Sequence, residues 1–180
     1  MNHRLNKFVA LFAVALALSG CGVAAKPPAP AAKADIPVGT QVGNLAPNFK
    51  MNADDGSDFA LSSTKGKTTT LVFLSAQGCS GCIAEAQALN TVKRSYGDAL
   101  QVVAVDVSGA PKSVLDAFKS AAGNPTFTWL ADDQGEISKL YRVAALDTTF
   151  VLDRAGKIVF HDEESTTADT FKQVLAQLKP

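Results

Sequence analysis

Two cysteines with two residues between them, Cys79 and Cys82, are the side chains best suited to chemistry in this sequence. They come after an apolar run, residues 70–74, and before a run of helix-forming residues, 83–96. A thiol at the beginning of a helix faces unpaired backbone N–H groups and the positive end of the helix dipole. Both effects favour the reactive thiolate, so the pair is predicted to be a redox-active dithiol.

The segments on either side of the pair alternate between strand-like and helix-like patterns. Strands are predicted at residues 59–62, 68–74, 99–107, 127–130, 149–152 and 157–161. Helices are predicted at residues 83–96, 111–121 and 134–141, with a last helix capped by Thr166 or Thr167. Because strands and helices alternate and the last two strands form a hairpin, the expected fold class is α/β, with a central mixed sheet flanked by helices.

The composition is that of a globular protein without a strongly charged partner. Hydrophobic residues make up 47% of the 180 residues, which is enough for one domain with a substantial core. Lysine and arginine together number 17, and so do aspartate and glutamate. This balance provides no basic excess, and we expect no nucleic-acid partner.

The first residues have the pattern of an export signal. A short basic stretch, residues 2–7, precedes an apolar run, residues 8–18, that is too short to span a bilayer as a helix. The sequence Leu-Ser-Gly-Cys at residues 18–21 then resembles the lipobox of bacterial lipoproteins, whose cysteine carries lipid and becomes the first residue after cleavage. This resemblance implies a lipidated Cys21 and an extracytoplasmic, membrane-anchored protein. The alternative is ordinary secretion, with Cys21 a bystander thiol.

The chain therefore divides into three predicted parts. Residues 1–20 form a lipoprotein signal peptide, and residues 21–42 form an Ala/Pro-rich tether. Residues 43–180 hold the predicted strands and helices. With lipid on Cys21, only the pair at residues 79 and 82 remains of the three cysteines, so a long-range structural disulfide is not expected.

Four segments of the last part carry a family resemblance. They are residues 43–49 (GNLAPNF), 79–85 (CSGCIAE, matching C-x-x-C-x-x-E), 141–143 (YRV) and 148–158 (TTFVLDRAGKI). In this order they resemble the TlpA/ResA-type thiol–disulfide oxidoreductases, which are membrane-tethered redoxins. The resemblance implies a thioredoxin-like fold with an N-terminal redoxin extension. It also implies exchange with protein substrates and an upstream redox donor, mostly as a reductant in cytochrome c or metal-centre maturation, with no cofactor. We expect a monomer.

The resemblance also suggests a role for each site residue. Cys79 lies nearer the helix start and is expected to be the more exposed, so it is assigned as the attacking thiolate, and Cys82 as the resolving thiol. Glu85 follows Cys82 by three residues and shares its helix face. The family uses a glutamate here to tune the thiols and to move protons. The alternative is an acid placed favourably in the first turns of a helix.

The chain departs from the family in the loops predicted to face a substrate, which contain Gly78, Ser80, Gly81, Asp147 and Thr148. Gly78 stands where the family has tryptophan, and Asp147 stands where it has a cis-proline. Because a cis bond before a residue other than proline costs about 2.5–4 kcal/mol, we expect a trans bond before Asp147. Its carboxylate would then lie near the sulfurs and raise the pKa of Cys79, unless the side chain points to solvent.

Two other functions would use the same cysteines. Two thiolates suit Cu(I) or Zn(II), and a metallochaperone-like module is the first alternative. Copper chaperones of this superfamily add a histidine, but Ala145 occupies that position and His161 is expected at the surface, so no metal ligands are assigned. A peroxiredoxin-like peroxidase is the second alternative. Val72 and Ala76 replace the proline and the Thr or Ser that peroxiredoxins have before the reactive cysteine.

Overall fold

The computed structural model describes residues 35–178 of the chain. Residues 1–34, which include the predicted signal peptide, Cys21 and most of the predicted tether, lie outside the described residues. Within residues 35–178, no helix is both long enough and apolar enough to cross a membrane.

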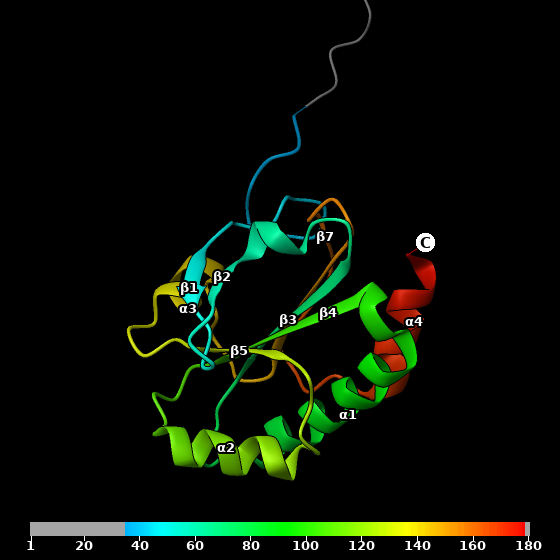
Figure 1. Ribbon diagram of the computed structural model, residues 1–180. Helices are drawn as coiled ribbons and strands as arrows, with labels where there is room; N and C mark the ends of the chain where they lie inside the picture. The colour runs from blue at the N-terminus through cyan, green and yellow to red at the C-terminus, as the bar shows by residue number, and fades with distance from the viewer. Residues whose placement is uncertain (1–34, 179–180) are drawn as a thin grey trace, which may run out of the picture. The chain divides into compact units, whose positions relative to one another are not determined.

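A five-stranded sheet with the order β5-β4-β3-β6-β7 forms the centre of the fold (Figure 1). The strands are β3 (Thr68–Leu74), β4 (Leu100–Asp106), β5 (Thr128–Ala131), β6 (Thr148–Leu152) and β7 (Ile158–Asp162). Strands β3, β4 and β5 run parallel, whereas β6 is antiparallel to β3 and β7 is antiparallel to β6. The predicted mixed sheet is therefore confirmed, including its terminal hairpin.

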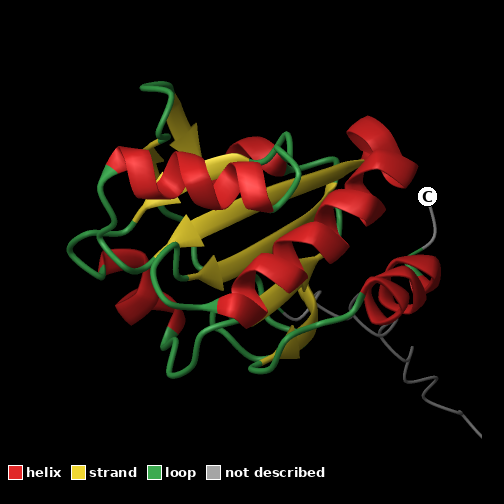
Figure 2. Cartoon of the chain, turned by 90° about the horizontal axis from the view of Figure 1, so that it is seen from below, coloured by secondary structure: helices red, strands yellow, loops and turns green. Residues whose placement is uncertain are grey.

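The α-helices cover both faces of this sheet. They are α1 (Ser80–Tyr96), α2 (Lys112–Ala121), α3 (Glu136–Tyr141) and α4 (Ala168–Gln177). Buried residues of α1, α2 and α4 share one core cluster, and those of α3 belong to a second cluster on the other face. In Figure 2, some of the red helices cross in front of the yellow strands and others lie beside or below the sheet.

Strand β3 is central because its side chains are almost all apolar or β-branched. Residues from Thr69 to Leu74 are buried, and successive side chains point to opposite faces of the sheet. Val72 and Leu74 pack in the cluster that contains α1, whereas Leu71 and Phe73 pack in the cluster that contains α3. The strand thus joins the two cores and ends at the sheet edge where α1 begins.

An aromatic cluster closes the face of the sheet opposite α1. It consists of Phe49, Phe59, Phe73, Tyr141 and Phe150. The ring centroids of Phe73 and Tyr141 are 5.6 Å apart, and those of Tyr141 and Phe150 are 5.2 Å apart. The Tyr141 hydroxyl donates a 2.7 Å hydrogen bond to the Pro47 carbonyl. This bond ties the N-terminal segment to the end of α3.

The N-terminal segment differs from the prediction in two places. A hairpin of β1 (Lys50–Asn52) and β2 (Asp58–Ala60) is present, and β1 was not predicted. The strand predicted at residues 59–62 stops at Ala60, and a 3₁₀ helix, η1 (Leu61–Thr64), follows. The hydroxyls of Ser63 and Thr64 donate to carbonyls three residues back, at 2.7 and 2.9 Å. Such local side-chain bonds favour a turn over a strand.

The fold also includes residues that sequence analysis assigned to the tether. The Leu45 N–H donates to the Pro37 carbonyl, and the Gly39 N–H donates to the Leu45 carbonyl. The Gly43 N–H donates to the Ile158 carbonyl at the start of β7. Residues 37–42 are therefore hydrogen-bonded to the domain, because their backbone groups pair with a loop that lies beside the terminal hairpin.

Replacing Phe73 with alanine should remove the aromatic side chain through which β3 contacts Tyr141 and Phe150. The side chain is fully buried, so we expect the free energy of unfolding to fall by about 3–5 kcal/mol. Urea denaturation followed by circular dichroism measures the loss. Leu140→Ala is the matched control, because Leu140 is 42% exposed and should change stability by less than about 0.5 kcal/mol. Equal effects of the two variants would contradict the assignment of the core.

Candidate active site

Cys79 and Cys82 are joined by a disulfide at the N-terminus of α1, just beyond the end of β3. Cys79 is the N-cap residue, and its sulfur accepts a 3.1 Å hydrogen bond from the Cys82 N–H. Cys82 is fully buried, whereas Cys79 is only partly buried. The two sulfurs therefore differ in access: an incoming thiol reaches Cys79 more easily.

The loop between β3 and α1 is held by hydrogen bonds to Cys82 in α1 and to Asp106 in β4. The Ser75 N–H donates to the Cys82 sulfur at 3.4 Å. Asp106, the last residue of β4, accepts a 3.0 Å hydrogen bond from the Ala76 N–H and a further bond from the hydroxyl of Ser108. A buried carboxylate from the next strand thus fixes the backbone that leads into the cysteines.

Glu85 lies one turn after Cys82 and is 1% exposed. Its Oε1 atom accepts hydrogen bonds from the Thr149 hydroxyl at 2.9 Å and from the Thr166 N–H at 3.3 Å. Burial, with a smaller contribution from the nearby Asp147 carboxylate, raises the pKa of Glu85 from 4.5 to about 8, against the opposing effect of the two hydrogen-bond donors. The side chain is therefore protonated at pH values where a surface glutamate is ionised.

Asp147 takes the position that the family fills with cis-proline, and its side chain points inward. Within residues 35–178 every peptide bond is trans, which confirms the expected trans bond before Asp147. The residue has a φ of 62°, and its N–H donates to the Phe73 carbonyl at 2.9 Å. The side chain is buried, and one carboxylate oxygen accepts a hydrogen bond from the Ser165 hydroxyl. The alternative that Asp147 points to solvent is wrong.

The carboxylate of Asp147 is close to both sulfurs. One oxygen of Asp147 and the sulfur atoms of Cys79 and Cys82 all lie within 4.8 Å of one another. A disulfide has no thiolate to bind a metal, so metal binding at these atoms would require the reduced pair. His161 is away from this group: its ring stacks on Phe150 with centroids 4.2 Å apart.

The other predicted loop residues have different surroundings. Gly78, with a φ of 69°, and Ser80 are exposed beside Cys79. A Cβ atom on Gly81 would lie 3.0 Å from Asp147 Oδ2 and 3.1 Å from Ser165 Oγ, so glycine lets these groups approach the helix start. Thr148 is buried, and its hydroxyl donates to the Ala145 carbonyl at 2.7 Å.

Three residues of the site were not predicted from the sequence: Thr149, Ser165 and Thr166. Thr149 and Thr166 lie 64 and 81 residues after Glu85 along the chain. Ser165 lies 18 residues after Asp147. No local pattern marks them, because each acts through a contact made by chain folding. Thr166 was predicted only as a possible helix cap, and the cap of α4 is Thr167, whose hydroxyl accepts from the Thr170 N–H.

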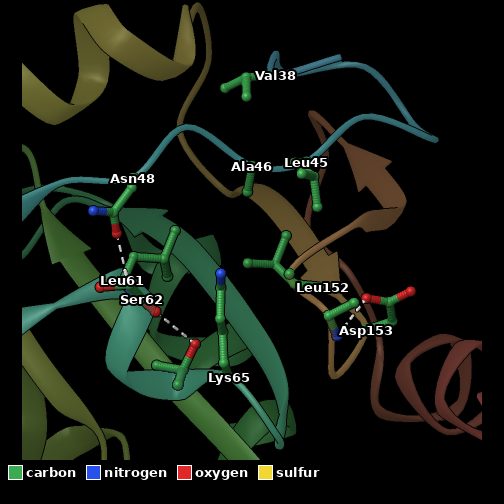
Figure 3. A pocket seen from close by; sticks show the side chains of 12 residues that line it. Val38, Leu45, Ala46, Asn48, Leu61, Ser62, Lys65, Leu152 and Asp153 are labelled. Carbon is green, nitrogen blue, oxygen red and sulfur yellow. Dashed lines mark hydrogen bonds between the residues drawn. The ribbon is translucent and has the colours of Figure 1, made fainter. Parts of the chain in front are cut away.

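A separate cavity of about 340 Å³ lies near the opposite end of β6 (Figure 3). Leu152, the last residue of β6, lines this cavity, whereas Thr148 begins β6 next to Asp147. Its walls are mostly apolar, from Val38, Leu45, Leu61 and neighbouring residues, and neither cysteine is among them. The disulfide between Cys79 and Cys82 therefore lies outside this cavity.

Comparison with known proteins assigns the family. Residues 42–161 match the AhpC/TSA family. The chain belongs to the AhpC/TSA family. Among relatives of this redoxin, "Thioredoxin-like protein YneN" of Bacillus subtilis is 37% identical over 123 residues, covering 67% of this chain and 71% of the relative. "Thiol-disulfide oxidoreductase ResA" of Geobacillus thermodenitrificans is 32% identical over 142 residues, covering 77% and 79%.

A solved structure supports the fold of this redoxin. The putative thiol:disulfide interchange protein DsbE from Chlorobium tepidum superposes with a TM-score of 0.68 and 27% sequence identity. The match covers 77% of this chain and 99% of that protein. The predicted thioredoxin-like fold and the predicted kinship with thiol–disulfide oxidoreductases are thus confirmed.

Replacing Glu85 with glutamine should change how stability depends on pH. The folded-state pKa of about 8 lies above the ordinary value of 4.5, so the unfolded chain loses this proton first as pH rises. The wild-type free energy of unfolding should therefore fall between pH 4.5 and about 8, by a few kcal/mol. Glutamine cannot ionise, so Glu85→Gln should lack this fall and should be the more stable protein at pH 8. Urea denaturation of the oxidised proteins at pH 5 and pH 8 measures the difference.

Glu136→Gln is the matched control, because Glu136 is exposed in the first turn of α3. It should follow the wild-type pH dependence. A Glu85→Gln curve parallel to the wild type would show that Glu85 is ionised in the folded protein at neutral pH.

Proposed function

We propose that this redoxin exchanges disulfides with protein thiols outside the cytoplasm, where lipid on Cys21 holds it at a membrane. The observation that carries the proposal is the disulfide between Cys79 and Cys82 at the first turn of α1. The pair belongs to a chain whose relative ResA is named as a thiol–disulfide oxidoreductase. The reducing direction, of the kind used in cytochrome c or metal-centre maturation, is assigned from the resemblance to that group.

Cys79 is the nucleophile in this proposal. In the reduced protein its thiolate would be stabilised by the N-terminus of α1, where the Cys82 N–H already donates to its sulfur. The thiolate attacks a substrate disulfide and forms a mixed disulfide, releasing the first substrate thiol. Cys82 then attacks the Cys79 sulfur, releases the second substrate thiol and restores the internal disulfide. The substrate gains two electrons, and an upstream dithiol donor returns them to the pair.

Glu85 supports proton movement in this cycle. Cys82 must lose a proton when it attacks and regain one when the disulfide is reduced. Glu85 is buried three residues further along the same helix, with a pKa raised to about 8 by burial. A carboxyl group that titrates near neutral pH is matched to transfer a proton to or from a thiol.

Replacing Cys82 with serine should trap substrate proteins on Cys79, because the mixed disulfide can no longer be resolved. Non-reducing electrophoresis should show dithiothreitol-sensitive adducts of Cys82→Ser in an envelope extract. Cys79→Ser is the control and should accumulate far fewer adducts, since the remaining sulfur is fully buried. More adducts on Cys79→Ser than on Cys82→Ser would make Cys82 the attacking thiol and Cys79 the resolving thiol. Rapid peroxide consumption, or stoichiometric Cu or Zn in the purified reduced protein, would favour the peroxidase or the metal-binding alternative.

Replacing Cys21 with serine should abolish lipid attachment if residues 18–21 act as a lipobox. Cells grown with a fatty-acid analogue should label the wild-type protein and leave Cys21→Ser unlabelled, and the variant should leave the membrane fraction. Cys79→Ser is the control and should keep both the label and the membrane location. Label that persists on Cys21→Ser would contradict the proposed anchor.

A further inference from the structure

We propose that Glu85 and Asp147 form an acid pair that shares one proton, and that Asp147 passes this proton to and from the Cys82 sulfur. The proposal rests on the proposed disulfide exchange and extends it, because it makes Asp147 a catalytic acid–base residue. The resemblance to the family suggests no such role, since the family has proline at this position.

Each of the two carboxyl groups has one buried oxygen without a hydrogen-bond partner, and a single proton between them would satisfy both. Glu85 Oε1 accepts from Thr149 and Thr166, while Glu85 Oε2 is buried and has no hydrogen-bond partner. Asp147 Oδ2 accepts from Ser165, while Asp147 Oδ1 is buried and also has none. Ionised carboxylates only accept hydrogen bonds, but a protonated one can donate. A proton on Oε2 donated to Oδ1 satisfies both atoms at once.

Electrostatics support the same arrangement. The neighbouring Asp147 carboxylate raises the pKa of Glu85, in addition to the larger effect of burial. Two carboxyl groups that are close together resist double ionisation, so one of them keeps a proton to higher pH.

Few other charges face this pair. Helix α1 contributes Cys79 and Cys82, and the segment before α4 contributes the neutral groups of Ser165 and Thr166. Asp147 is the charged neighbour with the largest effect on the pKa of Glu85. Asp106, the buried carboxylate at the end of β4, instead accepts hydrogen bonds from the Ala76 and Ser108 segments.

Asp147 is close enough to the cysteines to exchange a proton with Cys82 after a small movement. Its oxygen lies within 4.8 Å of both cysteine sulfurs, and the missing Cβ of Gly81 leaves room for the carboxylate. The φ of 62° and the hydrogen bond from the Asp147 N–H to the Phe73 carbonyl hold the side chain inward. Aspartate and asparagine tolerate this left-handed region better than most residues.

The shared proton moves to Cys82 when the internal disulfide is reduced and returns to the acid pair when the disulfide forms again. When an external thiolate attacks Cys79, the internal S–S bond breaks and its electron pair passes to the Cys82 sulfur. Asp147 delivers the shared proton to that sulfur, and Glu85 and Asp147 are left as two carboxylates. In the reverse step Cys82 returns its proton to the pair as it attacks the mixed disulfide. The only redox partners are the external thiol and the substrate disulfide.

Carboxyl-carbon NMR of the oxidised protein tests the shared proton directly. In the wild type, the side-chain carboxyl carbons of Glu85 and Asp147 should both change chemical shift in one step near pH 8. In Asp147→Asn, which can keep the left-handed backbone, the Glu85 step should move to lower pH because the like charge is gone. Asp133→Asn, at an exposed position, should leave the step unchanged. An Asp147 carbon that does not respond at the Glu85 step would overturn the proposal.

The rate at which dithiothreitol reduces the Cys79–Cys82 disulfide tests the role in catalysis. Asp147→Asn should react at least about tenfold more slowly than the wild type, and its pH profile should lose the inflection near pH 8. An unchanged rate and profile would overturn the catalytic role.

If Asp147→Asn does not fold, Glu85→Gln replaces it: the Asp147 carbon should then lose its step near pH 8. A wild-type disulfide that no dithiol reduces would refute the proposed function, while the NMR titration would still decide whether the pair shares a proton.

Discussion

A carboxyl group buried behind a disulfide is the constraint on which the site depends. An ionised carboxylate away from water is costly unless hydrogen bonds or a counter-charge compensate it. Glu85 receives two hydrogen bonds, one from β6 and one from the segment before α4, but no cation is among the main influences on its pKa. The acid therefore keeps its proton to a pH of about 8. Its side chain comes from α1, and its hydrogen-bond donors come from β6 and from the segment before α4.

Two opposite electrostatic influences act on the sulfurs. The start of α1 supplies a backbone N–H at 3.1 Å from the Cys79 sulfur and favours a thiolate there. The carboxylate of Asp147, within 4.8 Å, opposes a thiolate. A protonated Glu85 adds no further negative charge, so burying it limits the repulsion that a newly formed thiolate meets. The distribution of a single proton over this site thus sets the charge that the cysteines experience.

The dipeptide between the cysteines and the loop that carries Asp147 depend on each other. A side chain on Gly81 would come within 3.0 Å of Asp147 and 3.1 Å of Ser165, so a larger residue requires those groups to move. The replacement of cis-proline by Asp147 and the glycine before Cys82 are therefore parts of one local arrangement. The trans bond and the left-handed backbone of Asp147 then direct a polar group to a place where proline would present only its ring.

The sequence by itself determined the dithiol, its place at a helix start, and the alternation of strands and helices. These features are local: the C-x-x-C spacing, the apolar run of β3 and the hairpin around Gly156 each depend on neighbouring residues. Strand β1 was not predicted, because its pairing with β2 and not an apolar pattern makes it a strand. The strand predicted at residues 59–62 ends at Ala60, because local side-chain hydrogen bonds favour η1 after it.

Only the tertiary structure decided the surroundings of Glu85 and the direction of Asp147. The donors to Glu85 come from 64 and 81 residues along the chain, and the donor to Asp147 comes from 18 residues away. No periodic pattern records which polar groups will meet after folding, because a hydrogen bond depends on position in space. The sequence around Asp147 is compatible with a side chain that points to solvent. The contacts with Phe73, Gly81 and Ser165 direct this side chain toward the cysteines.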